Sequence, residues 1–139
     1  MSLATVLLPV FVQVFLTFFL GIWMGKERMQ AARAGQIDGK DAALYPVRWP
    51  EKAQLVSNSF HNQLELPPLF YVLVILALIT QKADWLFVLM SWVFVISRIA
   101  HAAVHTTSNK MSWRGQAFLI GVFVLMAMWL ILAIRVLLF

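Results

Sequence analysis

Four apolar stretches, each long enough to cross a lipid bilayer, constrain this chain more than any other feature of its sequence. We place them at residues 3–24, 52–80, 85–105 and 114–139. A helix needs about 20 apolar residues to span the hydrocarbon core. Only 12% of the residues are charged, whereas about a quarter are charged in a soluble domain. The sequence therefore predicts an all-α integral membrane protein, a single domain folded as a four-helix bundle.

Lysine and arginine residues set the expected orientation of the bundle. Most of them lie in the polar connection that follows the first run, and Lys110 and Arg114 lie in the connection before the fourth. The opposite side has only Lys82 and Arg135. The positive-inside rule then places both termini outside and the two basic connections in the cytoplasm. The net charge of +5 is thus a topology signal, and we expect no nucleic-acid partner.

One face of the second run is polar. Its residues are spaced i, i+3, i+4 and i+7, which places them on one side of a helix. They are Asn58, His61, Asn62 and Glu65. A carboxylate within a membrane helix is costly unless it is paired or hydrated, so it indicates a functional site. Pro67 and Pro68 follow directly and lack amide donors, which predicts a kink just past Glu65.

The third run turns polar toward its end, where Arg98, His101 and His105 share one helix face. The turn between the second and third runs is very short, so these two helices are antiparallel neighbours. The polar end of the third run and the polar start of the second then lie at the same depth. Two polar faces at one depth predict one shared pocket, which opens toward the cytoplasm.

A third polar stripe follows the first run, and it allows two interpretations. Gln13, Thr17, Gly21 and Arg28 fall on one side of a continuous helix. Small and polar residues of this kind pack against a neighbouring membrane helix. Alternatively, the stripe lines the polar pocket, with Arg28 at its end.

Two structural alternatives apply to the polar pocket. Glu65 could form a buried ion pair with Arg98 or Arg28, which would be costly to break but is weak evidence of function. A metal could instead be held by the side chains of His61, Glu65, His101 and His105. Because neighbouring arginines would repel a cation, we expect no metal.

With these residues in place, the chain resembles the MAPEG family, the membrane-associated proteins of eicosanoid and glutathione metabolism. The strongest element is Asn-x-x-Glu followed by proline and Leu-Phe, which residues 62–70 carry. The third helix of the family has an arginine, then a histidine or tyrosine, then a tyrosine, at the spacing of Arg98, His101 and His105. In the prostaglandin E synthase and microsomal glutathione transferase branches an arginine follows at the position of Arg114.

The resemblance implies a homotrimer that binds glutathione between neighbouring subunits and a hydrophobic small-molecule substrate from the bilayer. Arg114 would lie near the sulfur and favour the thiolate. Arginines match the carboxylates of the tripeptide, and Glu65 can accept hydrogen bonds from its ammonium group. The expected cofactor-binding residues are Arg28, Asn62, Glu65, Arg98, His101 and His105, with Asn58 and His61 beside them.

Three positions depart from the family pattern. Asn58 stands where the family has an arginine, His61 occupies a second basic position, and His105 replaces an aromatic hydroxyl. We expect a glutathione-dependent transferase or peroxidase-like enzyme that conjugates or reduces hydrophobic electrophiles, in a bacterial inner membrane rather than a microsomal membrane. The alternative is a non-catalytic membrane protein that binds a lipid or an amphipathic anion in the same cleft.

Overall fold

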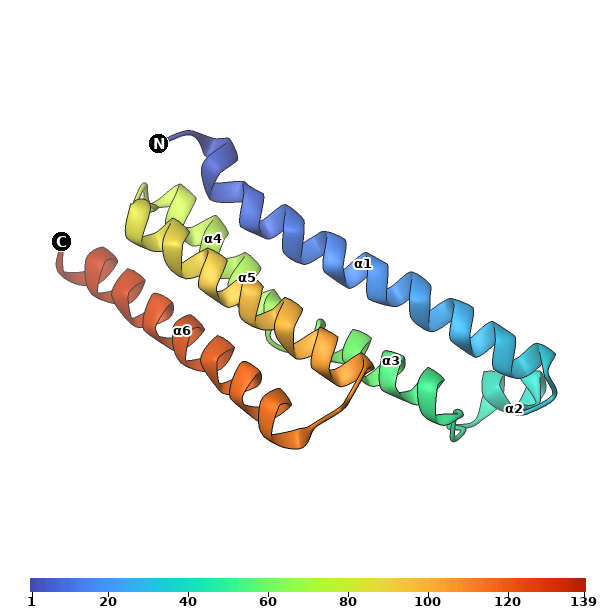
Figure 1. Cartoon of the computed structure of the whole chain (residues 1–139). Helices are drawn as coiled ribbons and strands as arrows, with labels where there is room; N and C mark the ends of the chain where they lie inside the picture. Colours follow the sequence, from blue (N-terminus) through green and yellow to red (C-terminus); the bar gives the residue numbers. More distant parts are fainter.

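A computed structural model describes all 139 residues, as six helices and no strand (Figure 1). The helices are α1 (Leu3–Arg33), α2 (Gly39–Leu44), α3 (Glu51–Asn62), α4 (Pro67–Ile79), α5 (Trp85–Thr106) and α6 (Met111–Leu138). Four segments are long and apolar enough to cross a membrane, namely α1, α3 with α4, α5, and α6. The predicted all-α class with four membrane-spanning segments is confirmed.

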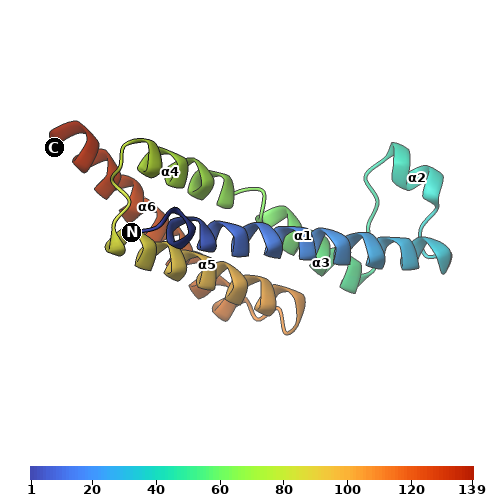
Figure 2. The same cartoon turned by 90° about the horizontal axis from the view of Figure 1, so that it is seen from above.

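Helix α1 continues past residue 24, where the apolar run was predicted to end, and stops at Arg33. The extension consists of good helix formers such as Lys26, Glu27 and Arg28. The helix ends just before Gly35, whose φ of 73° lies in the left-handed region that favours glycine. The short helix α2 then forms within the polar connection, separate from the bundle (Figure 2).

The second membrane-spanning segment is interrupted at residues 63–66, between α3 and α4. Pro67 and Pro68 occupy the first two positions of α4. Neither has an amide hydrogen, so the carbonyls of Gln63 and Leu64 lose their helical donors. The predicted kink is confirmed, although the interruption contains Glu65 rather than following it. The carboxylate therefore projects from a turn between two helices.

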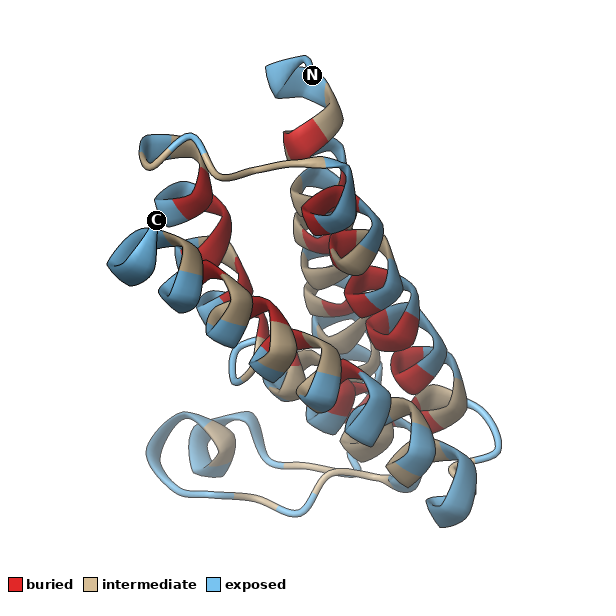
Figure 3. Cartoon of the chain, turned by 90° about the vertical axis from the view of Figure 1, so that its left-hand side faces the viewer, coloured by how far each residue is buried: buried red, intermediate tan, exposed pale blue.

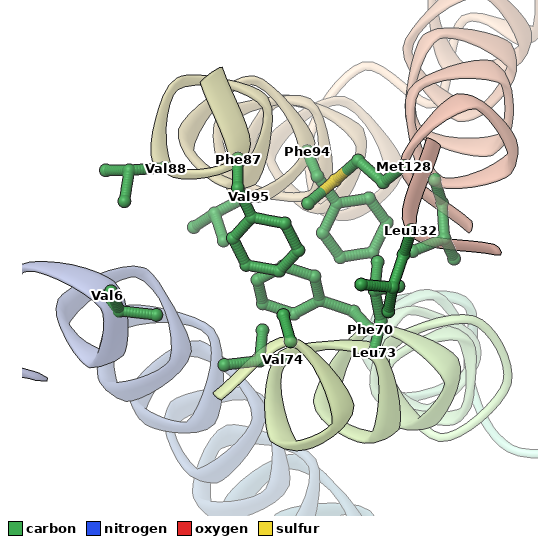
Figure 4. Packing of buried hydrophobic residues seen from close by; sticks show 12 residues of the cluster. Val6, Phe70, Leu73, Val74, Phe87, Val88, Phe94, Val95, Met128 and Leu132 are labelled. Carbon is green, nitrogen blue, oxygen red and sulfur yellow. The ribbon is translucent and has the colours of Figure 1, made fainter. Parts of the chain in front are cut away.

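The hydrophobic core lies where α4, α5 and α6 meet, with the start of α1 at its edge (Figure 4). Phe70 of α4 and Phe94 of α5 stack at a centroid distance of 4.7 Å, and neither is exposed. Met128 of α6 covers them and is also buried. Buried residues are concentrated on the inward sides of the helices, and exposed residues on the outward sides (Figure 3). The outward sides are rich in large apolar side chains such as Phe15 and Ile22, which suit contact with lipid.

The polar stripe of α1 packs against α3 and the turn that follows it. Gln13 Nε2 donates to Gln63 Oε1 over 2.9 Å, and both residues are buried. A Cβ on Gly21 would lie 3.0 Å from the ring of Phe60, so this glycine permits the close approach of the two helices. The interpretation of the stripe as a helix-packing surface is confirmed, and the interpretation that it lines the polar pocket is wrong within this chain.

At the far end of the bundle, Asp84 joins the start of α5 to the end of α6. One carboxylate oxygen accepts from the Phe87 backbone amide at 2.9 Å and so caps α5. The other lies 2.8 Å from Arg135 Nη1. This ion pair links the start of α5 to the end of α6, at the end of the bundle away from the polar pocket.

Candidate functional site

A pocket of about 520 Å³ lies between the end of α3, the end of α5 and the start of α6. This volume falls within the range of about 300–1,000 Å³ that is common for small-molecule sites. The lining is mostly polar. Its residues are Asn58, His61, Asn62, Glu65, His101, His105, Met111, Arg114, Gly115 and Phe118. The structure thus brings together all of the candidate residues expected from sequence except Arg28 and Arg98.

Glu65 is the only acidic residue of the pocket. It is exposed, and the ion pairs of the chain are those between Lys52 and Glu27 and between Arg135 and Asp84. The alternative that Glu65 forms a buried structural ion pair is therefore wrong. Because its helix is interrupted at this point, the carboxylate is held at the pocket without a partner and is free to bind a cationic group.

Arg114 enters the pocket from the first turn of α6, where Asn109 orients it. Its Nη1 donates to Asn109 Oδ1 over 2.7 Å. Asn109 has a φ of 48°, a left-handed conformation that asparagine tolerates better than most residues. A guanidinium has five N–H donors in a fixed plane, so most of those of Arg114 remain available for a bound anion.

His105 and Asn62 connect α5 to α3 across the pocket. Asn62 Nδ2 lies 3.3 Å from His105 Nδ1. His101 packs one turn earlier on α5, with its ring edge-on to that of His105 at a centroid distance of 5.5 Å. Both histidines are buried, at 3% and 5% exposure. They form a rigid wall of the pocket rather than a mobile surface.

Arg98 lies beneath the pocket and does not line it. The residue has no exposed surface, and its Nη2 donates to the backbone carbonyl of Asn62 over 3.1 Å. Nε and Nη1 have no partner within the chain. The guanidinium therefore supports the end of α3, at the carbonyl closest to the interruption.

Arg28 lies outside the pocket lining, against the side of α3 that faces α1. Its Nε donates to Ser57 Oγ over 3.1 Å, and its guanidinium lies 4.9 Å from the ring centroid of Trp49. The sequence placed it correctly on a polar stripe, but the stripe faces α3. Within one chain, Arg28 is therefore not part of the pocket lining.

The histidines and acids do not gather into a metal site. No group of three or more metal-ligating side chains lies at ligating distance anywhere in the chain. The alternative of a site built from His61, Glu65, His101 and His105 therefore has no support in the geometry.

A second cleft, about 770 Å³ in volume, adjoins the polar pocket between α4 and α6. All of its lining residues are hydrophobic. Glu65 lines the polar pocket and the next residue, Leu66, lines the apolar cleft. On α6, Phe118 belongs to the pocket and Val122, one turn later, to the cleft. The linings of the polar pocket and the apolar cleft thus follow one another along α6 and at the turn before α4.

Sequence reasoning missed several residues that shape the site. Met111 lines the pocket because α6 begins there, earlier than the predicted 114, and Gly115 and Phe118 follow it on the same face of α6. Asn109 could have been noticed as an asparagine in the turn after a helix, where asparagine often adopts left-handed backbone. Nothing in the sequence pattern distinguishes Phe118 from the lipid-facing aromatic residues around it.

A family model provides independent evidence. The model of the MAPEG family matches residues 6–134, a range that contains the whole pocket and most of every membrane-spanning segment. No curated protein and no solved structure matches the chain significantly. Because the family match covers nearly the entire chain and agrees with its four-helix membrane architecture, this integral membrane protein belongs to the MAPEG family.

Proposed function

We propose that this protein is a glutathione-dependent transferase or peroxidase-type enzyme that acts on hydrophobic electrophiles. The observation that carries the proposal is the presence of two charged groups in one pocket. They are the carboxylate of Glu65, which has no ion-pair partner in the chain, and the guanidinium of Arg114, which retains free donors. Family membership supports it, because MAPEG proteins include glutathione-dependent transferases. The motif spacing favours the prostaglandin E synthase and microsomal glutathione transferase branches.

The residues of the pocket fit the chemistry of the tripeptide. Glutathione carries two carboxylates, one ammonium group and one thiol. Glu65 has no partner in the chain and suits the ammonium group, while Arg114 suits an anion by charge-assisted hydrogen bonds. Asn58, His61 and Asn62 supply further polar contacts along α3.

The proposed chemistry assigns one task to each side of the pocket. When bound, glutathione would supply a sulfur nucleophile to an electrophile that arrives from the bilayer. Arg114 favours the thiolate over the thiol by electrostatic stabilisation. Glu65 and the side-chain amides of Asn58 and Asn62 would hold the peptide backbone of glutathione in one orientation, which lowers the entropic cost of reaching the reactive geometry. The apolar cleft beside Leu66 offers the electrophile a water-free approach.

We further propose a homotrimer with both termini outside and the pocket open to the cytoplasm. Arg28 supports this assembly, because it does not line the pocket of its own chain and would be available to that of a neighbouring subunit. The chain has no cysteine, so single cysteines introduced at Ser108 and Lys82 can be labelled without background. Selective labelling of Ser108→Cys from the cytoplasmic side would support the orientation, and the reverse pattern would overturn it.

Isothermal titration of the detergent-solubilised protein with glutathione tests the binding function. Loss of one charge-assisted contact in Arg114→Ala should weaken binding by about 1.5–3 kcal/mol, or about 10- to 100-fold. The thiolate absorbance of the bound tripeptide should fall in parallel. Arg33→Ala is the matched control, because Arg33 is exposed in the last turn of α1 and remote from the pocket. No heat of binding at millimolar glutathione would reject the proposal.

The second candidate is a non-catalytic protein that binds a lipid or an amphipathic anion. The position of the larger apolar cleft next to the polar pocket along α6 favours it, since an amphiphile has one part suited to each. Native mass spectrometry of the purified protein would detect a retained lipid and count the subunits. A retained lipid together with no glutathione binding would favour this candidate over the first.

A further inference from the structure

We propose that Asn62 is a positioning residue that holds His105 in the tautomer protonated at Nε2, so that the imidazole presents a hydrogen-bond donor to the pocket. The proposal that a bound thiol or carboxylate accepts a hydrogen bond from this donor rests on the proposed function. The tautomer of His105 does not depend on that function, because it can be measured in the protein without ligand.

The hydrogen bond between Asn62 and His105 carries the inference. Asn62 Nδ2 faces His105 Nδ1 at 3.3 Å. A side-chain amide nitrogen only donates, so Nδ1 must offer its lone pair and the ring proton must sit on Nε2. The imidazole has few other options, because His105 is only 5% exposed and its rotation is restricted by the surrounding helices.

The remaining ring nitrogen is accessible from the pocket. Nε2 of His105 makes no hydrogen bond within the chain, and it does not belong to the buried polar atoms that lack a partner. His105 lines the same pocket as Glu65 and Arg114. An Nε2–H group therefore adds a neutral donor to a wall whose other strong donor is a guanidinium. Such a donor strengthens the binding of an anionic group without requiring a proton transfer.

The main chain at Asn62 is held to α5 by a second hydrogen bond. Arg98 donates to the Asn62 carbonyl at 3.1 Å, and Arg98 belongs to the same helix as His105. Two bonds thus join residue 62 to α5, one from its carbonyl and one from its side chain. Other charged or titratable groups approach His105 from each neighbouring element. They are Arg98 and His101 on α5, Arg114 on α6, and His61 and Glu65 from the α3 side.

Nitrogen NMR of the histidine side chains tests the tautomer directly. The three histidines can be assigned by single substitution to glutamine, and two-bond 15N–1H correlations distinguish Nε2–H from Nδ1–H. We expect Nε2–H for His105 in the wild type. Asn62→Asp should move the proton to Nδ1, because a carboxylate only accepts. Asn58→Asp is the matched control, since it adds the same charge one turn earlier, where Asn58 bonds to Gln54 and not to a histidine.

An Nδ1–H signal for wild-type His105, or an unchanged tautomer in Asn62→Asp, would overturn the proposal whether or not glutathione binds. If glutathione binds the wild type, a second measurement follows. The amide nitrogen of glutamine occupies nearly the place of Nε2–H, so His105→Gln should retain affinity within about threefold. His105→Asn and His105→Phe should lose about 5- to 10-fold, the value of one neutral hydrogen bond of about 1–1.4 kcal/mol. Equal losses in all three variants would refute the donor role.

Discussion

The buried hydrogen bond between Gln13 and Gln63 should be the main polar contact that fixes α1 against the rest of the bundle. The donor–acceptor distance is 2.9 Å, and the two residues are 0% and 1% exposed. Gln13→Leu removes the donor and leaves the buried Gln63 Oε1 without its hydrogen-bond partner. Gln63→Leu removes the acceptor and also a 3.3 Å bond from Gln63 Nε2 to the carbonyl of Ser59.

The expected size of the effect follows from the groups left unpaired. An unsatisfied buried polar atom costs about 1–3 kcal/mol, but hydrogen bonds between membrane helices are worth on average only about 0.6 kcal/mol and at most about 1.7. Gln13 Oε1 already lacks a partner, so removing this side chain also relieves one unsatisfied acceptor. We therefore expect Gln13→Leu to lower the free energy of unfolding by about 1 kcal/mol. The double variant should be more stable than the sum of the single losses implies, by about 0.6–1.7 kcal/mol.

Reversible unfolding in mixed micelles, followed by fluorescence of the six tryptophans, measures this double-mutant cycle. A control cycle combines Thr80→Val with Gln63→Leu, because the Thr80 hydroxyl donates to the Leu76 carbonyl of its own helix at 2.7 Å, at the far end of α4. The control should be additive within about 0.3–0.5 kcal/mol. A coupling energy for Gln13 and Gln63 that is no larger than the control would refute the argument.

Four further substitutions, at Gly121, Gly25 and Asp84, test helix packing and helix capping by thermal unfolding. A Cβ on Gly121 would lie 2.8 Å from Ser97 Oγ, so Gly121→Ala should lose about 1–3 kcal/mol through overpacking. Gly25→Ala, with no atom within 4 Å of its new Cβ, should instead gain up to about 1 kcal/mol. Asp84→Asn retains the helix cap but loses the partly exposed ion pair with Arg135, and should cost about 0.2–1 kcal/mol. Asp84→Ala should cost about 0.5–2 kcal/mol more through loss of the cap, and equal losses in the two variants would contradict the capping role.

The sequence predicted the membrane architecture and most of the pocket because both depend on local patterns. Apolar length defines a membrane helix, and the spacing from Asn58 to Glu65 defines one helix face. The short turn before Trp85 makes α4 and α5 antiparallel, which places His101 and His105 at the depth of that face. Each of these inferences uses only neighbouring residues and the regular geometry of a helix.

The positions of the two arginines outside the pocket could not be predicted in the same way. Arg28 shares a stripe with Gln13, but a stripe does not state which helix it will face. Arg98 shares a face with His101 and His105, yet it lies a turn deeper, where the pocket has already closed. Its guanidinium reaches the Asn62 carbonyl instead. That contact depends on the angle at which α3 meets α5, and such angles are set by the packing of the whole bundle.

The interruption between α3 and α4 links the fold to the proposed chemistry. In a continuous helix, the Asn62 carbonyl would accept a strong backbone bond from residue 66, and its side chain would be directed by the helix alone. Here the following turn offers the carbonyl only a 3.5 Å contact from the Glu65 amide, and Arg98 donates to it at 3.1 Å. One donor of the buried arginine thus compensates for a weakened backbone acceptor, which would be costly to leave buried and unpaired. Because the same residue contacts His105, the two prolines that interrupt the helix also determine where the histidine wall stands and where Glu65 projects.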